Sequence, residues 1–302
     1  MVIDMVTQNR ILLSFHRDRK MALSRMLVLI VGLLCASLGT AACIQLSGEP
    51  LQGALLWGQV TPGSRVRLND QSLNVSPDGA VVFGFGRDAK STATLRVENG
   101  HICEQQLAVG GRQYRVQQIE GVPQRTVTPD PGHLQRIRRE AQLVRQAKSA
   151  NTVRTDFLKG FQWPLLGPIT GVYGSQRVYN GKPGNPHYGV DVAAPTGTPV
   201  STPAPGKVVL AEQDLFFSGG TLIIDHGMEV SSSFLHLSKL LVKVGDWVEP
   251  GMMVAEVGAT GRVTGPHLDW RMNWRNQRVD PQLLVPPMLH PVLNPKLPVV
   301  AE

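Results

Sequence analysis

Three short segments of this chain hold residues that could do metal chemistry. The first reads H-Y-G-V-D and runs from His187 to Asp191. The second, F-L-H-L, places His236 in an apolar run, and the third, G-P-H-L-D, contains His267 and Asp269. Imidazole and carboxylate groups are normal zinc ligands, and a catalytic zinc site needs three of them plus an open position for water.

The spacing within the first segment requires a bend in the chain. Pro186 and Gly189 disfavour a helix here. On a straight strand His187 and Asp191 share a face but lie roughly 13 Å apart at the backbone. Both can reach one ion only if the chain bends, and Gly189 provides that conformational freedom.

The other two segments are weak signals when each is taken alone. His267 and Asp269 are two residues apart, so they point to the same face of a strand. A lone histidine in an apolar strand, such as His236, is more often structural. We interpret Asp225-His226-Gly227 as a hairpin turn, not as a fourth cluster of ligands.

All three segments lie in a β-rich region, residues 156–290. Its valine- and isoleucine-rich runs predict strands, separated by turns such as Pro205-Gly206 and Pro250-Gly251. The expected strands cover residues 198–201, 206–211, 221–225, 230–237 and 252–257.

Residues 162–284 resemble the lysostaphin-type (LytM-like) zinc metalloendopeptidases, a family of bacterial cell-wall hydrolases. The resemblance covers about 40% of the chain and implies a compact antiparallel β structure with the metal in a groove. It rests on the ordered blocks P-L-L-G-P-I-T-G-V-Y-G, H-Y-G-V-D, A-P-T-G-T-P-V, G-G-T-L-I-I-D-H-G, F-L-H-L-S, V-K-V-G-D-W-V-E-P-G and G-A-T-G-R-V-T-G-P-H-L-D.

The resemblance assigns a role to each candidate residue. It implies that His187 and Asp191 are the first two zinc ligands and that His236 and His267 assist catalysis. The family's last motif is H-x-H, whose second histidine is the third zinc ligand. This chain has Asp269 at that position, so its ligand set would be His-Asp-Asp.

The aspartate affects the expected chemistry. Aspartate is a competent zinc ligand, but two carboxylates cancel the charge of the ion, where the family's ligands leave one positive charge. A less positive centre polarises a carbonyl less and lowers the pKa of bound water less. We therefore expect slower hydrolysis, or an optimum at higher pH.

The function implied is zinc-dependent hydrolysis of peptide bonds in peptidoglycan stem or cross-link peptides. Tyr173 and Tyr188 flank the first segment and are candidates to line the substrate groove, with core packing as the other interpretation. No H-E-x-x-H motif is present, which excludes a thermolysin-type route. The alternatives are a catalytically impaired LytM-like adaptor that activates other cell-wall hydrolases or serves division proteins, and a pure wall-binding protein.

Composition limits the classes of protein that remain. The 302 residues are 42% hydrophobic and 18% charged, which suits two modest folded domains and excludes a chain disordered throughout. The 31 glycines and 22 prolines favour turns and short strands. The net charge of +7 suits a polyanionic partner such as the cell wall. No nucleic-acid partner is expected.

Residues 1–42 have the pattern of a secretion signal. Arg25 precedes an uncharged run, 26–42, that ends in small residues. Cleavage after Ala42, retention as a membrane anchor and a lipoprotein cut before Cys43 are the three alternatives. Each places the rest of the chain in the periplasm or envelope of a bacterium, with membrane contact only through an uncleaved N-terminus or a lipid anchor.

Residues 44–122 are expected to form a small all-β domain, a sandwich or a small barrel. Short alternating runs at 65–68, 80–83 and 94–97 are separated by turns. His101 follows the N-G turn and is expected at the surface. Cys43 and Cys103 are an even pair in an oxidising compartment, so they form either a disulfide or two free thiols.

Residues 123–155 are expected to be a basic helical linker. Asp130 is the predicted N-cap and Pro131 the first helical residue. An apolar face repeats at Leu134, Ile137, Ala141 and Val144. The helix either packs on one domain or forms a basic surface or lid. The predicted fold class is therefore mainly β: a small sandwich-like domain, this linker, the metallopeptidase domain and a tail, 291–302.

Overall fold

The computed structural model describes residues 43–120 and 131–288. The expected signal (1–42), the predicted cap Asp130 and the tail lie outside these residues. Everything described below belongs to one compact unit, which begins at Cys43. Over these two ranges no helix is long and apolar enough to cross a membrane.

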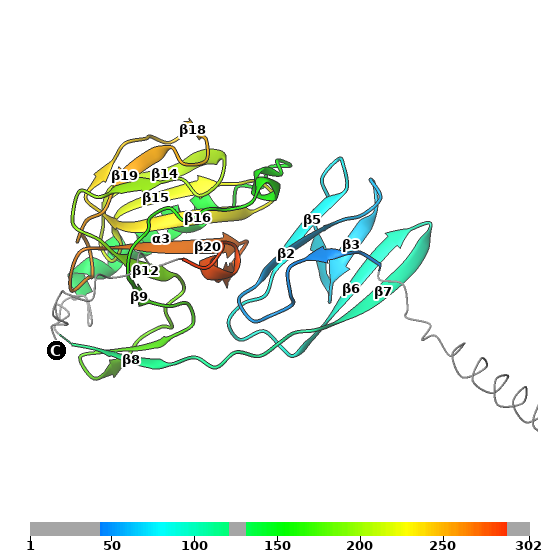
Figure 1. Cartoon of the computed structure of the whole chain (residues 1–302), viewed down its shortest axis with the longest axis horizontal. Helices are drawn as coiled ribbons and strands as arrows, with labels where there is room; N and C mark the ends of the chain where they lie inside the picture. Colours follow the sequence, from blue (N-terminus) through cyan, green and yellow to red (C-terminus); the bar gives the residue numbers. More distant parts are fainter. Residues whose placement is uncertain (1–42, 121–130, 289–302) are drawn as a thin grey trace, which may run out of the picture. The chain divides into compact units, whose positions relative to one another are not determined.

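The first part of the described chain is built from strands alone (Figure 1). One antiparallel sheet has the order β1-β2-β5 and another the order β4-β3-β6-β7. The strands are β1 (Leu46–Ser47), β2 (Leu55–Gln59), β3 (Arg65–Leu68), β4 (Gln71–Leu73), β5 (Ala80–Gly84), β6 (Thr92–Asn99), β7 (His101–Ala108) and β8 (Val116–Ile119).

Alternation along these strands places one apolar row of each sheet in a shared core. In β3, Val66 and Leu68 are buried while Arg65 and Arg67, which alternate with them, are exposed, as period two requires. They join Leu56 and Phe83, from the other sheet, in one hydrophobic cluster. The sandwich-like arrangement is confirmed, and so is the disulfide between Cys43 and Cys103.

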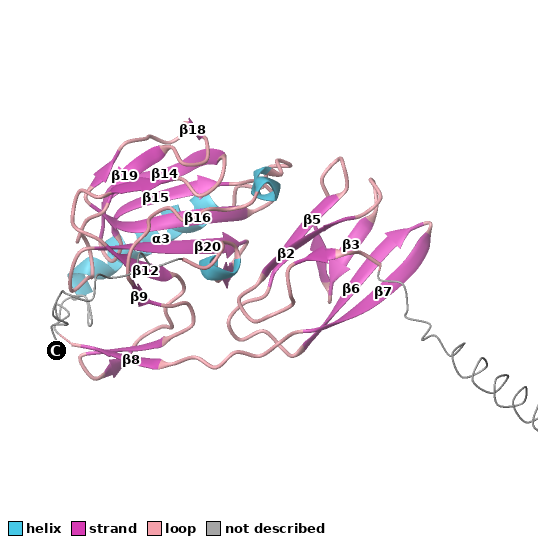
Figure 2. Ribbon diagram, viewed as in Figure 1, coloured by secondary structure: helices cyan, strands magenta, loops and turns pink. Residues whose placement is uncertain are grey.

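Strands also dominate the second part, which adds a single α-helix within the described residues (Figure 2). The elements are η1 (Pro131–His133), α3 (Leu134–Lys148), η2 (Asp156–Lys159), β9 (Ile169–Gly171), β10 (Gln176–Tyr179), β11 (Lys182–Pro183), β12 (Val190–Ala193), β13 (Pro199–Ser201), β14 (Gly206–Leu215), β15 (Gly219–Asp225), β16 (Val230–Leu237), β17 (Lys239–Leu240), β18 (Trp247–Val248), β19 (Met253–Glu256), β20 (His267–Trp274), β21 (Gln277–Val279) and η3 (Pro281–Leu283).

An eight-stranded sheet forms the centre of this part. Its order is β18-β14-β15-β16-β20-β12-β9, with β21 paired to β20. β13, β19 and β17 form a separate three-stranded sheet. β8 pairs in parallel with β10, so the last strand of the predicted small domain joins a sheet with strands of the peptidase region.

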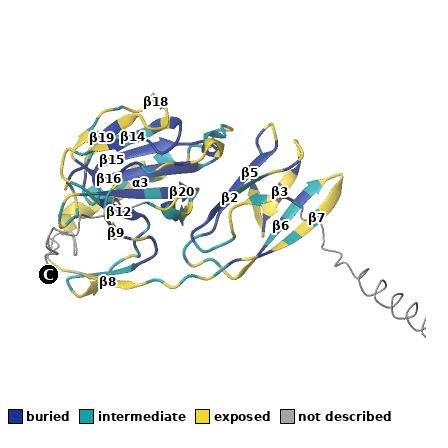
Figure 3. Ribbon diagram, viewed as in Figure 1, coloured by how far each residue is buried: buried dark blue, intermediate teal, exposed yellow. Residues whose placement is uncertain are grey.

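Both faces of the central sheet are covered along its inner strands β15 and β16. β15 and β16 are buried along their whole length (Figure 3). Leu222 and Ile224 enter the main core. Ile223, which points to the opposite face, packs with Leu210 and Leu215 in a second apolar cluster.

The helix α3 covers that second cluster. Val144 and Ala147 pack against it, so the helix lies on the sheet. The helix begins at Leu134 after a 3-10 turn. Pro131 opens this 3-10 turn, so the helical segment starts at the predicted residue, where the missing N–H of proline costs nothing.

Candidate metal site and catalytic histidines

Strand register brings the separate segments together on one face of the sheet. β12 pairs with β20 so that Asp191 lies opposite Asp269. Leu235 of β16 is opposite Asp269 on the other side. A bend at Gly189 precedes β12 and turns His187 back toward Asp191, which the spacing of the first segment required.

His187, Asp191 and Asp269 form a compact, buried group. One ligand atom from each lies within 4.8 Å of the others. Nε2 of His187 and Oδ1 of Asp191 are 3.0 Å apart, yet neither atom has a hydrogen-bond partner among the described residues. Two buried polar atoms that face each other without a hydrogen-bond partner are placed so that one cation could bind both.

Arg271 and Arg177 each bind one of the two carboxylates. Arg271 donates from Nε to both oxygens of Asp269, at 2.9 and 3.1 Å, and from Nη2 to Oδ2 at 2.5 Å. Arg177 donates from Nη2 to Oδ2 of Asp191. Both pairs favour the ionised carboxylate, and the two guanidinium charges cancel those of the carboxylates.

Electrostatics keep both aspartates ionised in spite of their burial. Burial opposes the charged form of Asp269, but Arg271 and His187 hold its pKa far below the usual range. Burial also opposes ionisation of Asp191, and His187 and Arg177 outweigh it, so the pKa of Asp191 is lowered too.

Two glycines leave the space that these pairs occupy. A Cβ at Gly171 would lie 2.2 Å from Oδ2 of Asp191. A Cβ at Gly189 would lie 2.5 Å from Oδ1 of Asp269 and 2.6 Å from Cγ of Arg271. Gly189 therefore serves the site in two ways: it lets the chain bend before β12, and its missing side chain leaves room for Asp269 and Arg271.

His236 and His267 stand together beside this group. Their ring centroids are 5.1 Å apart, and Nε2 of His267 is 3.8 Å from Oδ1 of Asp191. Nδ1 of His236 is 2.8 Å from the Thr260 carbonyl, and Nδ1 of His267 is 2.9 Å from the Gly265 carbonyl. A carbonyl can only accept, so each Nδ1 carries the proton and each neutral ring keeps its lone pair on Nε2.

The backbone and the pKa of His236 also depend on its surroundings. Its φ of 65° is in the left-handed region, which an L-residue adopts at a cost. Burial, reinforced by His267 and opposed by Asp269, lowers the pKa of His236 to about 4. The ring is therefore neutral at physiological pH and able to accept a proton.

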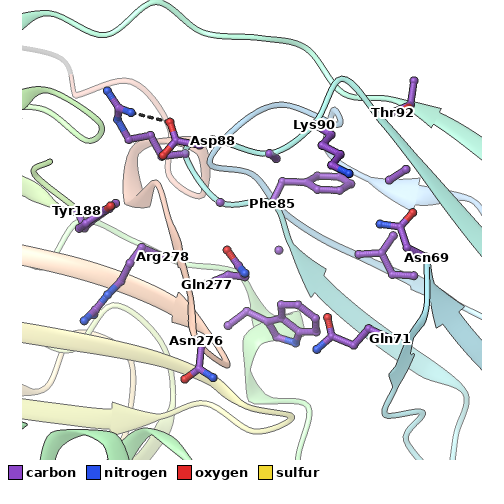
Figure 4. Close-up of a pocket in the computed structure, with 17 residues that line it drawn as sticks. Asn69, Gln71, Phe85, Asp88, Lys90, Thr92, Tyr188, Asn276, Gln277 and Arg278 are labelled. Carbon is purple, nitrogen blue, oxygen red and sulfur yellow. Dashed lines mark hydrogen bonds and ion pairs between the residues drawn. The ribbon is translucent and has the colours of Figure 1, made fainter. Parts of the chain in front are cut away.

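The two tyrosines that were candidates for the groove, Tyr173 and Tyr188, have different surroundings. Tyr173 is 1% exposed and donates from its hydroxyl to the Arg278 carbonyl at 2.7 Å, so it is a core residue. Tyr188 lines a different cavity, of about 460 Å³, together with Asn69, Phe85 and Gln277 (Figure 4).

His226 is confirmed as part of a turn between β15 and β16. The residue is fully buried. Its Nδ1 contacts the Pro205 carbonyl at 2.6 Å and its Nε2 contacts Oγ of Ser232 at 2.8 Å. With both nitrogens bonded, the ring has no free ligand atom.

Arg177 and Arg271 are the residues that sequence reasoning missed. Arg271 had a signal, because it follows Asp269 at strand period and shares its face. Arg177 lies on β10, and nothing in its neighbourhood marks it as a partner of Asp191.

Comparisons with known proteins are consistent with this geometry. Residues 185–281 match Peptidase family M23. The peptidoglycan DD-endopeptidase ShyB of Vibrio cholerae is 43% identical over 95 residues, 32% of this chain and 22% of ShyB. The cell division protein DipM of Caulobacter vibrioides is 31% identical over 132 residues, 42% of this chain and 21% of DipM. The chain thus spans about a fifth of the length of these relatives.

A solved structure resembles a larger part of the chain. It is a protein from Pseudomonas aeruginosa assigned to peptidase M23, with a TM-score of 0.60 and 29% identity, covering 78% of this chain and 95% of that one. By its ordered motifs, its β architecture and these matches, the segment 185–281 is a domain of peptidase family M23, the lysostaphin-type metallopeptidases.

Proposed function

We propose that this protein is a zinc-dependent endopeptidase that hydrolyses stem or cross-link peptides of peptidoglycan in the bacterial envelope. One observation carries the proposal: His187 and Asp191 present unbonded, buried ligand atoms to each other, with Asp269 completing the group. The similarity to a peptidoglycan DD-endopeptidase supports the choice of substrate.

The three residues suit a zinc ion. They supply one nitrogen and two carboxylate oxygens, which are normal zinc donors. Each carboxylate oxygen has two lone pairs, so Asp269 can accept from Arg271 and still bind a metal. When bound, zinc supplies Lewis acidity that polarises a carbonyl and lowers the pKa of water.

His236 and His267 would handle the proton. Each keeps the lone pair on Nε2 because Nδ1 donates to a backbone carbonyl. A neutral imidazole with its lone pair on Nε2 can accept a proton from water and pass it on. Once protonated, the same ring can donate to the oxyanion that develops on the substrate or to the leaving amine.

A second function, an adaptor that activates other wall hydrolases, is favoured by the arginines. Arg271 binds both oxygens of Asp269, and Arg177 binds Asp191. In this arrangement the guanidinium groups already balance the carboxylates that a metal would otherwise hold. An adaptor of this kind would need no ion.

Zinc content and hydrolysis measured together separate the two functions. The purified full chain should hold about one zinc per chain and digest purified peptidoglycan. His187→Ala should lose both properties. His101→Ala is the control, because His101 is exposed on β7 and should change neither.

Two results would contradict the endopeptidase proposal. The first is full hydrolysis by His187→Ala. The second is a wild-type protein that holds no zinc and cuts nothing. If this zinc-free protein accelerates digestion by a second wall hydrolase, the adaptor is the correct function.

A further inference from the structure

Two cations meet on one neutral oxygen beneath α3. Nζ of Lys148, at the end of the helix, donates to Oδ1 of Asn273 at 3.0 Å. Nη1 of Arg278, on β21, donates to the same Oδ1 at 2.9 Å. Asn273 itself is 1% exposed. Two positive charges are thus held close together by an amide that carries no charge.

No carboxylate balances these two charges in the described residues. Neither Lys148 nor Arg278 takes part in an ion pair there. The nearest candidate, Asp269, is already bound through both oxygens by Arg271. Burial, with the repulsion of Arg278 and Arg271, lowers the pKa of Lys148 well below its usual range. Burial and Arg271 lower the pKa of Arg278 to about 10.

A cavity of about 330 Å³ opens beside these cations, between α3 and the sheet. Lys148, Arg271 and Arg278 all line it. Ser233 also lines it, is 2% exposed, and has a hydroxyl without a hydrogen-bond partner among the described residues. Such an orphaned hydroxyl beside three cations is a donor that lacks an acceptor.

The cavity lies next to the metal group on the same face of the sheet. Ser233 is opposite Arg271, one step of two residues along β20 from Asp269. Asn273 is a further two residues along. Each step is roughly 7 Å, the rise of about two extended residues, so the cations lie about two to four peptide residues from the proposed scissile bond.

We propose that this cavity is a second binding site, which takes a carboxylate of the peptide substrate. The cations Lys148 and Arg278 supply the charge, and Ser233 supplies a neutral donor. Arg271 lines the cavity but is already paired with Asp269. The identity of the occupant as a peptide rests on the proposed function, whereas the need for an anion rests on the cations alone.

A carboxylate accounts for each of these features. It replaces the missing counter-ion, and its oxygens accept charge-assisted hydrogen bonds from a guanidinium and an ammonium together. The apolar residues of the cavity, Ile137, Ala141 and Leu235 among them, suit the aliphatic part of an amino acid. Peptides of the wall carry free carboxylates, so this site would select the part of the substrate beside the cut.

Binding to metal-stripped protein tests the site without hydrolysis. The probes are a soluble stem peptide released from peptidoglycan, the same peptide with its carboxylates converted to carboxamides, and acetate alone. Titration calorimetry should show the free peptide binding at least about tenfold more tightly than the carboxamide, the value of one charge-assisted hydrogen bond.

Matched variants locate the effect. Lys148→Met and Arg278→Met should each abolish the preference for the carboxylate form. Arg145→Met, on the exposed part of the same helix, should keep it. Equal affinity of both peptides for the wild type would overturn the proposal, as would a preference that survives both substitutions. Acetate binding as tightly as the peptide would show a site for free small anions and reject the peptide assignment.

A stability measurement provides a second readout. In buffer of low anion content, Lys148→Met should raise the melting temperature, because it removes a buried charge without a counter-ion. A lowered melting temperature would mean that the cation is already balanced, which contradicts the proposal. Failure of the wild type to cut peptidoglycan, with carboxylate-dependent binding intact, would reject the peptidase proposal and leave this site standing.

Discussion

Asp269 and Arg271 together resemble a neutral ligand in charge. The carboxylate is 1% exposed, and the guanidinium binds it at two nitrogens. The pair carries no net charge, as a neutral histidine carries none. The chemical consequence expected from the sequence, a centre weakened by a second carboxylate, therefore loses its main physical basis, because Arg271 returns the missing positive charge.

Substitutions at this pair should not be additive. Asp269→Ala should lose zinc, because two protein ligands rarely retain it. Asp269→His alone leaves Arg271 as a cation without its carboxylate, which costs about 3 kcal/mol or more in a buried pair. The double variant Asp269→His/Arg271→Met should therefore bind zinc more tightly than Asp269→His.

Zinc stoichiometry and competition with a chelator measure these differences, and a pH–rate profile on peptidoglycan adds the catalytic consequence. Arg139→Met, on the exposed face of α3, is the control. Unchanged zinc content in Asp269→Ala would show that this aspartate is not a ligand. Equal zinc affinity of the single and double histidine variants would show that Arg271 does not act through Asp269.

At the scale of elements, the segment that leads into β12 is tightly constrained in its conformation. The segment before the strand must bend at Gly189, and it passes close to the Asp269–Arg271 pair on β20. β20 in turn places its polar residues at period two, so one face carries the histidine, the aspartate and the arginine in order. The register of β12 on β20 thus places the two aspartates, and Gly189 leaves the space for the pair on β20.

Gly189→Ala should weaken zinc binding and leave the β fold intact. The added Cβ would lie 2.5 Å from Oδ1 of Asp269, a distance that forces the carboxylate to move. Zinc binding should fall by about tenfold or more, in line with losses seen when a residue that orients a metal ligand is changed, while circular dichroism still reports a β protein. Gly111→Ala is the control, because nothing lies within 4 Å of its Cβ. Full zinc affinity in Gly189→Ala would contradict the tight packing described.

The last turn of α3 contacts the sheet. Its apolar residues pack on the cluster of Ile223, while Lys148 reaches Asn273. Of the two interpretations of the helix, packing on one domain is confirmed. The same packing encloses the cavity between the helix and the sheet, so the linker contributes directly to the surroundings of the proposed site.

For the molecule as a whole, buried neutral histidines make stability depend on pH. Burial lowers the pKa of His226 to about 4, whereas the unfolded residue titrates near 6.5. At a pH between these two pKa values, His226 is protonated in the unfolded chain and neutral in the folded chain. Stability should therefore fall as the pH drops from about 6.5 to 4, by roughly 3 kcal/mol from this one residue, and it should not change above 6.5 on this account.

Urea unfolding at pH 7 and pH 4.5 measures this dependence. His226→Gln keeps a group that can bond to the Pro205 carbonyl but does not titrate, so the difference between the two pH values should shrink. His101→Gln, at an exposed position, should leave the difference unchanged. If the difference in stability between the two pH values is the same in His226→Gln as in the wild type, His226 is not the source of the pH dependence.

The sequence by itself determined several strands, among them 206–211, 221–225 and 230–237, the hairpin turn at His226 and the three segments with ligand-type side chains. Each of these depends on neighbours within a few residues, through alternation, turn chemistry or short motifs. Even the bend at Gly189 could be inferred, because His187 and Asp191 cannot otherwise meet.

Only the tertiary structure decided how the charges are balanced. Asp191 and Asp269 become neighbours through the register of β12 on β20, and Arg177 reaches Asp191 from a strand outside that sheet. The placement of Tyr173 in the core and the meeting of Lys148 with Arg278 likewise join parts distant in the sequence. The burial of a group and the compensation of its charge depend on all the residues packed around it, most of which are distant in the sequence. A local sequence pattern therefore cannot predict them.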